Sequence, residues 1–186
     1  GGQGAMAAVL GAEREALQAL CDAVTGEAGR VELANVNCPG QIVVSGSKEG
    51  VEAVVLRGKE AGAKRVIPLE VSGPFHSSLM APAADRLEAL LGEVAIAAPA
   101  VPLVANVTAD VVSDPEDVRK LLVRQVCAPV LWEDSVQRLI ALGVDTFVEF
   151  GPGSVLSGLI KKINKDVRIV TVNGAEAAAA AVPTLL

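Results

Sequence analysis

Short apolar segments and amphipathic stretches alternate along the first seventy residues in an order that few folds can accommodate. Residues 4–10 form an apolar run typical of a buried strand, and residues 13–24 repeat apolar side chains at helical spacing. Residues 31–37 and 41–45 then have the pattern of two strands on either side of a Pro-Gly turn. We expect these two strands to pair as a hairpin.

A second helix and a further strand complete this part of the chain. Ser47 stands in the position of an N-cap, and Gly62 marks the expected end of the helix. Residues 65–71 have the composition of a strand. The order is strand, helix, strand, strand, helix, strand, which is the split βαβ or ferredoxin-like arrangement. The sequence therefore predicts a ferredoxin-like βαββαβ subdomain over residues 4–71.

The remaining residues, 72–186, follow a different pattern of longer helices and more isolated strands. The expected elements are helices over 83–91, from Pro115 onward, over 132–142 and over 154–163, and extended segments over 101–106, 145–150 and 167–172. A succession of strand, turn, helix and strand is typical of α/β folds with parallel pairing. The strands are too few for a complete parallel sheet covered on both faces, so we expect an incomplete second domain. The alanine-rich tail is expected to be frayed or weakly helical.

Composition excludes several classes of function. A net charge of −6 and 2% aromatic residues argue against binding to nucleic acid, which needs cationic and stacking side chains. No apolar run reaches the length of a membrane span, and no signal peptide is recognisable. The three cysteines lack the spacing of a metal site, so we expect no metal. We expect their thiols to be reduced and buried or half-buried. The expected location is therefore the cytoplasm, or a plastid or mitochondrial matrix if the source is eukaryotic.

The chain has one histidine, His76, in a loop after a predicted strand. Histidine suits general base catalysis because its ordinary pKa of about 6.5 leaves it neutral near pH 7. A lone loop histidine is, however, more often a structural or surface residue. Ser72, Ser77 and Ser78 lie nearby, but none lies in the G-x-S-x-G turn that exposes a nucleophilic serine.

Two weaker candidates stay open at this point. Cys38, beside the Pro-Gly turn, could act as a thiol nucleophile with His76, or could simply pack beneath the hairpin. The turn Gly151 to Gly153 precedes a helix and could receive an anion, although a tight turn between strand and helix is the plainer interpretation.

Successive blocks of the chain resemble one family closely. The blocks are GAMAAVLG, ANVNCPGQIVVSG, AGAKRVIPLEVSGPFHSSLMAPAA, LLVRQVCAPVLW and VEFGPGSVLSGLIKKI. In this order they are similar to malonyl-CoA:acyl carrier protein transacylases, and they cover nearly the whole chain. The resemblance implies an α/β-hydrolase-like acyltransferase core into which a ferredoxin-like subdomain is inserted, and residues 72–186 would be the C-terminal portion of that core.

The resemblance also implies a reaction and a site. Malonyl passes from coenzyme A to an enzyme serine and then to the phosphopantetheine thiol of acyl carrier protein, without a cofactor. By resemblance His76 is the catalytic general base, and the backbone carbonyl of Gln125 orients its ring. Asn106 and Phe75 match substrate-site positions, and the bulky Phe75 suits malonyl selection. Acyl carrier protein and a coenzyme A thioester are the implied partners. By composition, Lys64–Arg65 and Lys161–Lys162 are candidate docking charges, although solvated helix and strand ends are the plainer interpretation.

Some blocks of the family have no counterpart in this sequence. These are the GQGSQ block, the GHSLG block with the nucleophilic serine, and the arginine that follows it. Gly1-Gly2-Gln3 matches better as the lead-in to GAMAAVLG than as a remnant of GQG. We therefore expect residues 1–186 alone to be inactive. Two other interpretations stay open: a non-catalytic ferredoxin-like binding module, and an acyltransferase domain of a polyketide synthase.

Overall fold

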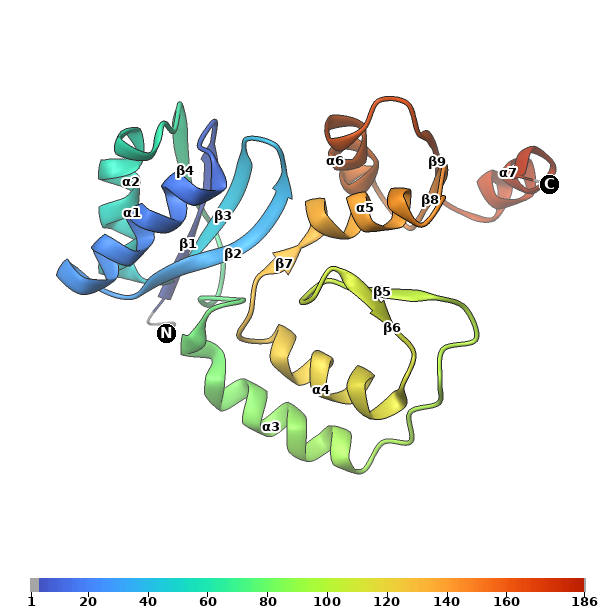
Figure 1. Cartoon of the computed structure of the whole chain (residues 1–186), viewed down its shortest axis with the longest axis horizontal. Coiled ribbons are helices and arrows are strands. Elements are labelled where there is room, and N and C mark those ends of the chain that lie inside the picture. Colours follow the sequence, from blue (N-terminus) through green and yellow to red (C-terminus); the bar gives the residue numbers. More distant parts are fainter. Residues whose placement is uncertain (1–3, 186) are drawn as a thin grey trace. The chain divides into compact units, whose positions relative to one another are not determined.

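The computed structural model of the chain describes residues 4–185, so the interpretation of Gly1-Gly2-Gln3 lies outside the described residues (Figure 1). The chain divides into two compact units, Gly1–Ser135 and Val136–Leu186. The boundary suggested by the sequence between residues 71 and 72 falls inside the first unit and stays a prediction.

The first unit begins with a four-stranded antiparallel arrangement. Its elements are β1 (Gly4–Leu10), α1 (Arg14–Glu27), β2 (Val31–Cys38), β3 (Gln41–Ser47), α2 (Lys48–Arg57), the 3-10 turn η1 (Gly58–Ala61) and β4 (Arg65–Leu69). The strands lie in the order β4-β1-β3-β2, and β2 and β3 form the expected hairpin. The predicted ferredoxin-like order is confirmed. The element bounds differ from those predicted by a few residues, because α1 runs three residues beyond Val24 and β4 ends two residues before Val71.

The core of this part lies between the sheet and helices α1 and α2, which cover one face (Figure 1). Leu17 and Val24 of α1 and Val44 of β3 are fully buried there. Burial of a Leu or Val side chain stabilises a fold by about 1.5–3 kcal/mol. Ser47 caps α2, since its hydroxyl accepts a hydrogen bond of 3.1 Å from the backbone N–H of Gly50. The cap that the sequence indicated is therefore present.

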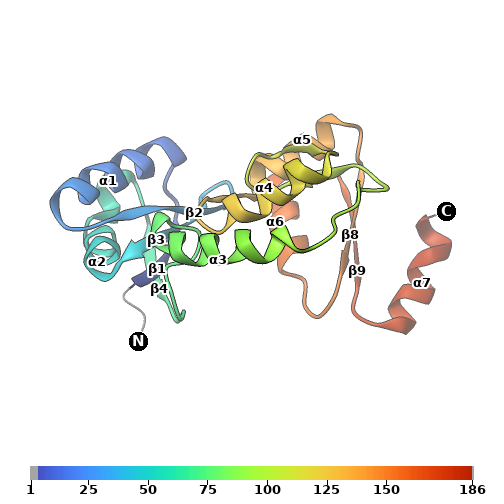
Figure 2. The same ribbon diagram turned by 90° about the horizontal axis from the view of Figure 1, so that it is seen from below.

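The rest of the first unit follows the loop that carries His76. Its elements are η2 (Ser78–Met80), α3 (Ala81–Gly92), β5 (Leu103–Ala105), β6 (Asp110–Val112), α4 (Pro115–Gln125) and β7 (Val130–Leu131). Helix α3 packs beside α4 (Figure 1 and Figure 2). Asp114 caps α4 by accepting hydrogen bonds from the N–H groups of Glu116 and Asp117. The short strands β6 and β7 were not predicted, and β7 adds to the sheet as a parallel neighbour of β2.

The second unit contains the remaining strand-helix-strand motif. Helix α5 (Trp132–Ala141) runs into it, and β8 (Thr146–Phe150), α6 (Val155–Ile163), β9 (Arg168–Val172) and α7 (Ala175–Leu185) follow. Strands β8 and β9 pair in parallel, as expected. The tail is a helix over most of its length and contains Pro183. Within residues 4–185, none of the helices has the length and apolar character that crossing a membrane would require.

Candidate active site

His76 lies in the loop between β4 and η2 and has an unusual backbone conformation. Its φ angle is +58°, in the left-handed region that non-glycine residues seldom adopt. A residue keeps such a conformation only where its surroundings fix it, and such residues are concentrated at functional sites. The loop therefore fixes the direction in which the His76 side chain leaves the backbone.

A short turn encloses His76. The hydroxyl of Ser77, which is fully buried, donates a hydrogen bond of 2.6 Å to the carbonyl oxygen of Pro74. The backbone N–H of Met80 donates to the carbonyl oxygen of Ser77 over 3.0 Å. The ring of Pro74 also packs against the backbone of Gly4, where an added Cβ would lie 2.5 Å from its ring carbons. These contacts join the histidine loop to the first strand of the sheet.

The imidazole of His76 meets the end of helix α4. Its Nδ1 atom lies 3.0 Å from the backbone carbonyl oxygen of Gln125, a residue 49 positions further along the chain. Gln125 is the last residue of α4, so helical N–H groups leave its carbonyl largely available. The side-chain amide of Gln125 donates to the carbonyl oxygens of Ala128 and Pro129, which fixes the turn after the helix.

This contact assigns the tautomer of the neutral ring. A carbonyl oxygen can only accept a hydrogen bond, so Nδ1 carries the proton and donates it to Gln125. The lone pair then lies on Nε2, which has no hydrogen-bond partner among the described residues. A neutral ring in this tautomer can accept a proton at Nε2, which is the chemistry that a general base requires.

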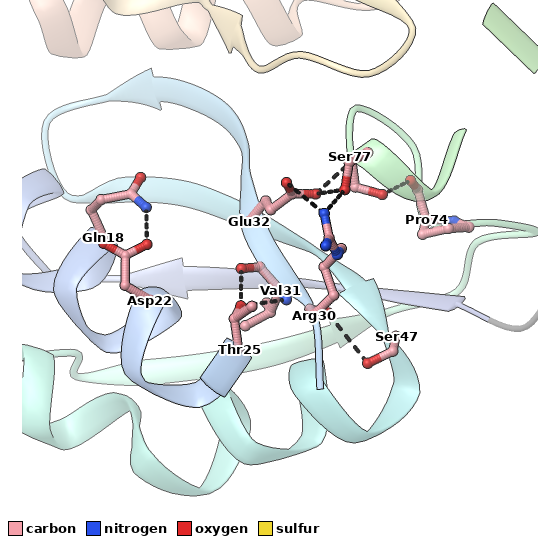
Figure 3. Close-up of polar contacts among 10 residues, drawn as sticks. Gln18, Asp22, Thr25, Arg30, Val31, Glu32, Ser47, Pro74 and Ser77 are labelled. Carbon is pink, nitrogen blue, oxygen red and sulfur yellow. Dashed lines mark hydrogen bonds and ion pairs between the residues drawn. The ribbon is translucent and has the colours of Figure 1, made fainter. Parts of the chain in front are cut away.

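The two serines after the histidine bind other protein groups. The hydroxyl of Ser77 binds Pro74 (Figure 3). Ser78 is bound by two charged side chains, Arg30 and Glu32, to which the sequence patterns did not point. The carboxylate of Glu32 accepts hydrogen bonds from the backbone N–H and the hydroxyl of Ser78 over 2.7 and 2.9 Å. Arg30 donates to the same hydroxyl over 2.7 Å. Alternation along β2 shows only that Glu32 points away from the core, so its partner could not be predicted.

Phe75 and Asn106, the two predicted substrate-site residues, both reach the surface. Phe75 is 39% exposed beside His76. Asn106 is also exposed, and its backbone carbonyl accepts a hydrogen bond of 2.8 Å from the N–H of Leu131. Asn106 and Gln125 line one largely apolar cavity of about 210 Å³, together with Leu103, Val104, Val118 and Leu121. The structure thus brings Gln125 into contact with His76 and places Asn106 and Gln125 in the lining of one cavity.

The remaining candidates have plainer structural explanations. Cys21 and Cys38 are buried, Cys127 is half-buried, and all three are free thiols, as predicted. Burial raises the pKa of Cys21 to about 12, and the neighbouring charges of Asp22 and Glu32 act in the same direction. A thiol of this kind is a poor nucleophile near pH 7. Cys38, the candidate partner of His76, is also buried, and its Sγ donates to Oε1 of Gln41 over 3.8 Å. Packing beneath the hairpin is therefore the better interpretation of Cys38.

The helix after the Gly151 to Gly153 turn already has an anion at its start. The carboxylate of Glu149 accepts hydrogen bonds from the N–H groups of Leu156 and Ser157 and from the hydroxyl of Ser157. The Ser157 hydroxyl, followed by these N–H groups, lowers the pKa of Glu149. The tight-turn interpretation is therefore the better one. In the part of the chain that the structure describes, His, Cys, Asp and Glu side chains form no group of three or more that could hold a metal ion.

Comparison with known proteins gives one consistent family. The family described as "Acyl transferase domain" matches residues 1–185. The malonyl CoA-acyl carrier protein transacylase of Bacillus subtilis (strain 168) is 51% identical over 184 residues, which are 99% of this chain and 58% of that protein. The Staphylococcus aureus (strain COL) protein of the same name is 45% identical over 175 residues, covering 94% of this chain and 57% of that protein.

Solved structures agree with this family. The acyl-carrier-protein S-malonyltransferase of Bartonella henselae is 44% identical, with a TM-score of 0.93 over 98% of this chain and 58% of that one. A malonyl-transacylase in complex with its type II polyketide synthase acyl carrier protein is 38% identical, with a TM-score of 0.92 over 98% of this chain and 59% of that one. The chain thus spans a little under three fifths of the length of these relatives.

Proposed function

We propose that this chain, which belongs to the acyl transferase domain family, supplies the general base of a malonyl-CoA:acyl carrier protein transacylase of fatty acid synthesis. The observation that carries the proposal is the contact of 3.0 Å between His76 Nδ1 and the Gln125 carbonyl, which leaves Nε2 as the basic atom. The two relatives that are 51% and 45% identical to this chain bear the name of this activity.

In the first half-reaction, His76 acts on a serine that a segment outside residues 1–186 would provide. Nε2 takes the proton of the serine hydroxyl while the serine oxygen attacks the carbonyl carbon of malonyl-CoA. The tetrahedral intermediate collapses, the C–S bond breaks, and the coenzyme A thiolate takes the proton from the imidazolium. A malonyl-serine ester and free coenzyme A result.

The second half-reaction runs the same steps in reverse with a different thiol. His76 removes the proton of the phosphopantetheine thiol of acyl carrier protein, and the thiolate attacks the ester carbonyl. The serine oxygen leaves and recovers its proton from the imidazolium. Serine, imidazole and two thiols account for every bond that forms or breaks, so the proposed chemistry needs no cofactor.

Gln125, Phe75 and Asn106 have supporting roles in this proposal. The Gln125 carbonyl keeps Nδ1 protonated and stabilises the imidazolium, as the carboxylate of a Ser-His-Asp triad does. Phe75 limits the size of the acyl group beside His76, and Asn106 contacts the substrate near Gln125. We include a cytoplasmic location in the proposal, because the curated relatives compared above are bacterial proteins.

A chimera tests the proposal. Residues 1–186 would replace the matching part of the Bacillus subtilis relative, whose remaining segment is expected to supply the serine. We expect the chimera to form a malonyl adduct, detected by mass spectrometry, and to pass it to acyl carrier protein. The isolated 186-residue chain should form no adduct. A folded chimera that forms no adduct would contradict the proposal.

A second candidate function is malonyl transfer in polyketide synthesis. It differs from the first in the carrier protein that receives the malonyl group. The similarity to a transacylase in complex with a polyketide synthase carrier protein favours testing that partner too. We expect faster transfer to a fatty acid synthase carrier protein than to a type II polyketide carrier protein. The opposite order would assign the chain to polyketide synthesis while leaving the role of His76 unchanged.

A further inference from the structure

Glu32 binds the chain immediately after His76, at a point where a helix would otherwise lack a cap. Ser77 occupies the N-cap position of η2, but its hydroxyl is turned back to Pro74 and caps nothing. The N–H of Ser78 therefore needs another acceptor, and the carboxylate of Glu32 provides it at 2.7 Å. A negative charge at this end of η2 and α3 is also favoured by the helix dipole.

Arg30 fixes the Glu32 carboxylate and its serine partner. The guanidinium donates to the Ser78 hydroxyl over 2.7 Å and lies 4.0 Å from a carboxylate oxygen of Glu32. The hydroxyl of Ser78 in turn donates to Glu32 over 2.9 Å. Hydrogen bonds that involve charged groups are shorter and stronger than neutral ones. Three such bonds therefore join Ser78 to the start of β2.

Strand β2 also supports the other half of the histidine contact. Asn35 and Val36 of β2 pair with Val130 and Leu131 of β7. The side chain of Gln125 binds the carbonyl oxygens of Ala128 and Pro129, which directly precede β7. One strand thus holds the loop of His76 through Glu32 and the end of α4 through β7.

We propose that Glu32 is a positioning residue for His76. Its carboxylate holds Ser78, and through Ser78 the left-handed backbone of His76, at the place where Nδ1 meets the Gln125 carbonyl. This inference rests on the proposed function of His76, and it adds a residue to which neither the sequence patterns nor the family resemblance pointed. Without the carboxylate, the loop should move relative to β2, and the ring should lose its single tautomer.

Nitrogen NMR of the histidine ring tests the inference directly, because His76 is the only histidine in the chain. The 186-residue chain is labelled with ¹⁵N, and the two ring nitrogens are observed at a pH where the ring is neutral. We expect wild type to show a protonated Nδ1 and an unprotonated Nε2, whose ¹⁵N chemical shifts are well separated. In E32A the two shifts should converge, because both tautomers become populated.

Two milder variants and one control keep the result interpretable. E32Q retains one acceptor oxygen, and S78A retains the backbone N–H bond, so each should keep more of the shift difference than E32A. If E32A fails to fold, these two variants carry the test. The side chain of Glu52, on the exposed face of α2, makes no hydrogen bond or ion pair among the described residues, so E52A should match wild type.

The outcomes separate the two proposals. A folded E32A with the wild-type shift difference, together with wild-type shifts in E32Q and S78A, would overturn the role of Glu32 and leave His76 as the proposed base. Averaged tautomers already in wild type would overturn both, because the ring would not be held by Gln125. Convergence in E32A with no change in E52A is the result that supports the inference.

Discussion

The buried hydroxyl of Ser77 donates a hydrogen bond of 2.6 Å to the carbonyl oxygen of Pro74, and this bond closes the turn in which His76 has its left-handed backbone. The bond is local, but its effect reaches the site. A left-handed residue other than glycine costs roughly 1–2 kcal/mol, which the surrounding contacts must offset.

Substitution of Ser77 by alanine should therefore loosen the turn. Loss of one hydrogen bond at a buried position costs about 1 kcal/mol, and the Pro74 carbonyl is left without this donor. We expect S77A to lower the free energy of unfolding by about that amount, measured by urea denaturation. S72A is the matched control, since Ser72 is exposed and makes no hydrogen bond in the described part of the chain. Equal losses in the two variants would argue against the closed turn.

The cap of α4 offers a second prediction. The carboxylate of Asp114 accepts hydrogen bonds from the N–H groups of Glu116 and Asp117 at 2.9 and 3.1 Å. D114A should destabilise the first unit by about 1 kcal/mol, and D114N by less, because asparagine is also a good N-cap. Thermal unfolding followed by circular dichroism measures the loss. The exposed Asp85 on α3 gives a control, D85A, and a D114A protein as stable as D85A would contradict the assignment of the cap.

Glu149 should make stability depend on pH. Its pKa is lowered in the folded chain by hydrogen bonds from Ser157 and Leu156. A lowered carboxyl pKa adds stability that is present above the unfolded value of about 4.3 and is lost as pH falls through the folded value. We expect wild type to be more stable than E149Q at pH 7, and the difference to shrink as the pH is lowered below about 4.

The control for this titration is an exposed carboxylate in the same unit. The side chain of Glu176, near the start of α7, makes no hydrogen bond or ion pair in the region that the structure describes. E176Q should therefore follow wild type through the acid range. A constant difference between wild type and E149Q from pH 7 to pH 3 would show that the hydrogen bonds to Ser157 do not perturb the carboxyl group.

The cysteines should differ in their reaction with thiol reagents. Burial raises the pKa of Cys21 to about 12, and Cys21 is fully buried, so very little thiolate is accessible at pH 8. Cys127 also has a raised pKa through burial, but it is half-buried. Peptide mapping after alkylation should show Cys127 modified before Cys21 in the native chain and both modified in urea. Native Cys21 that reacts as fast as a free thiol would contradict its burial.

Much of the first unit could be predicted from local patterns. The βαββαβ order followed from apolar alternation, the Pro-Gly turn and the cap at Ser47, all of which act over a few residues. Strands β6 and β7 have only three and two residues. Strand β6 pairs with the neighbouring β5, and β7 pairs with the distant β2. So short a segment carries no periodicity from which it could be recognised.

The candidate site shows the same division between local and distant information. His76 could be selected as the only imidazole, and the family resemblance indicated Gln125. The structure supplies the contact between residues 49 positions apart. The pairing of Glu32 with Ser78 joins residues 46 positions apart, and neither side chain has a local pattern that marks it. Such contacts depend on how β2 and the His76 loop come together in space.

The rate of malonyl transfer by an H76A chimera tests the central claim most directly. The wild-type chimera and H76A would be compared in single turnovers from malonyl-CoA, at equal amounts of folded protein. Loss of a general base typically slows a reaction by about 10²–10⁴-fold, and we predict a loss in that range. A transfer rate in H76A equal to that of the wild-type chimera would show that another group removes the serine proton, and the account of His76 would be wrong.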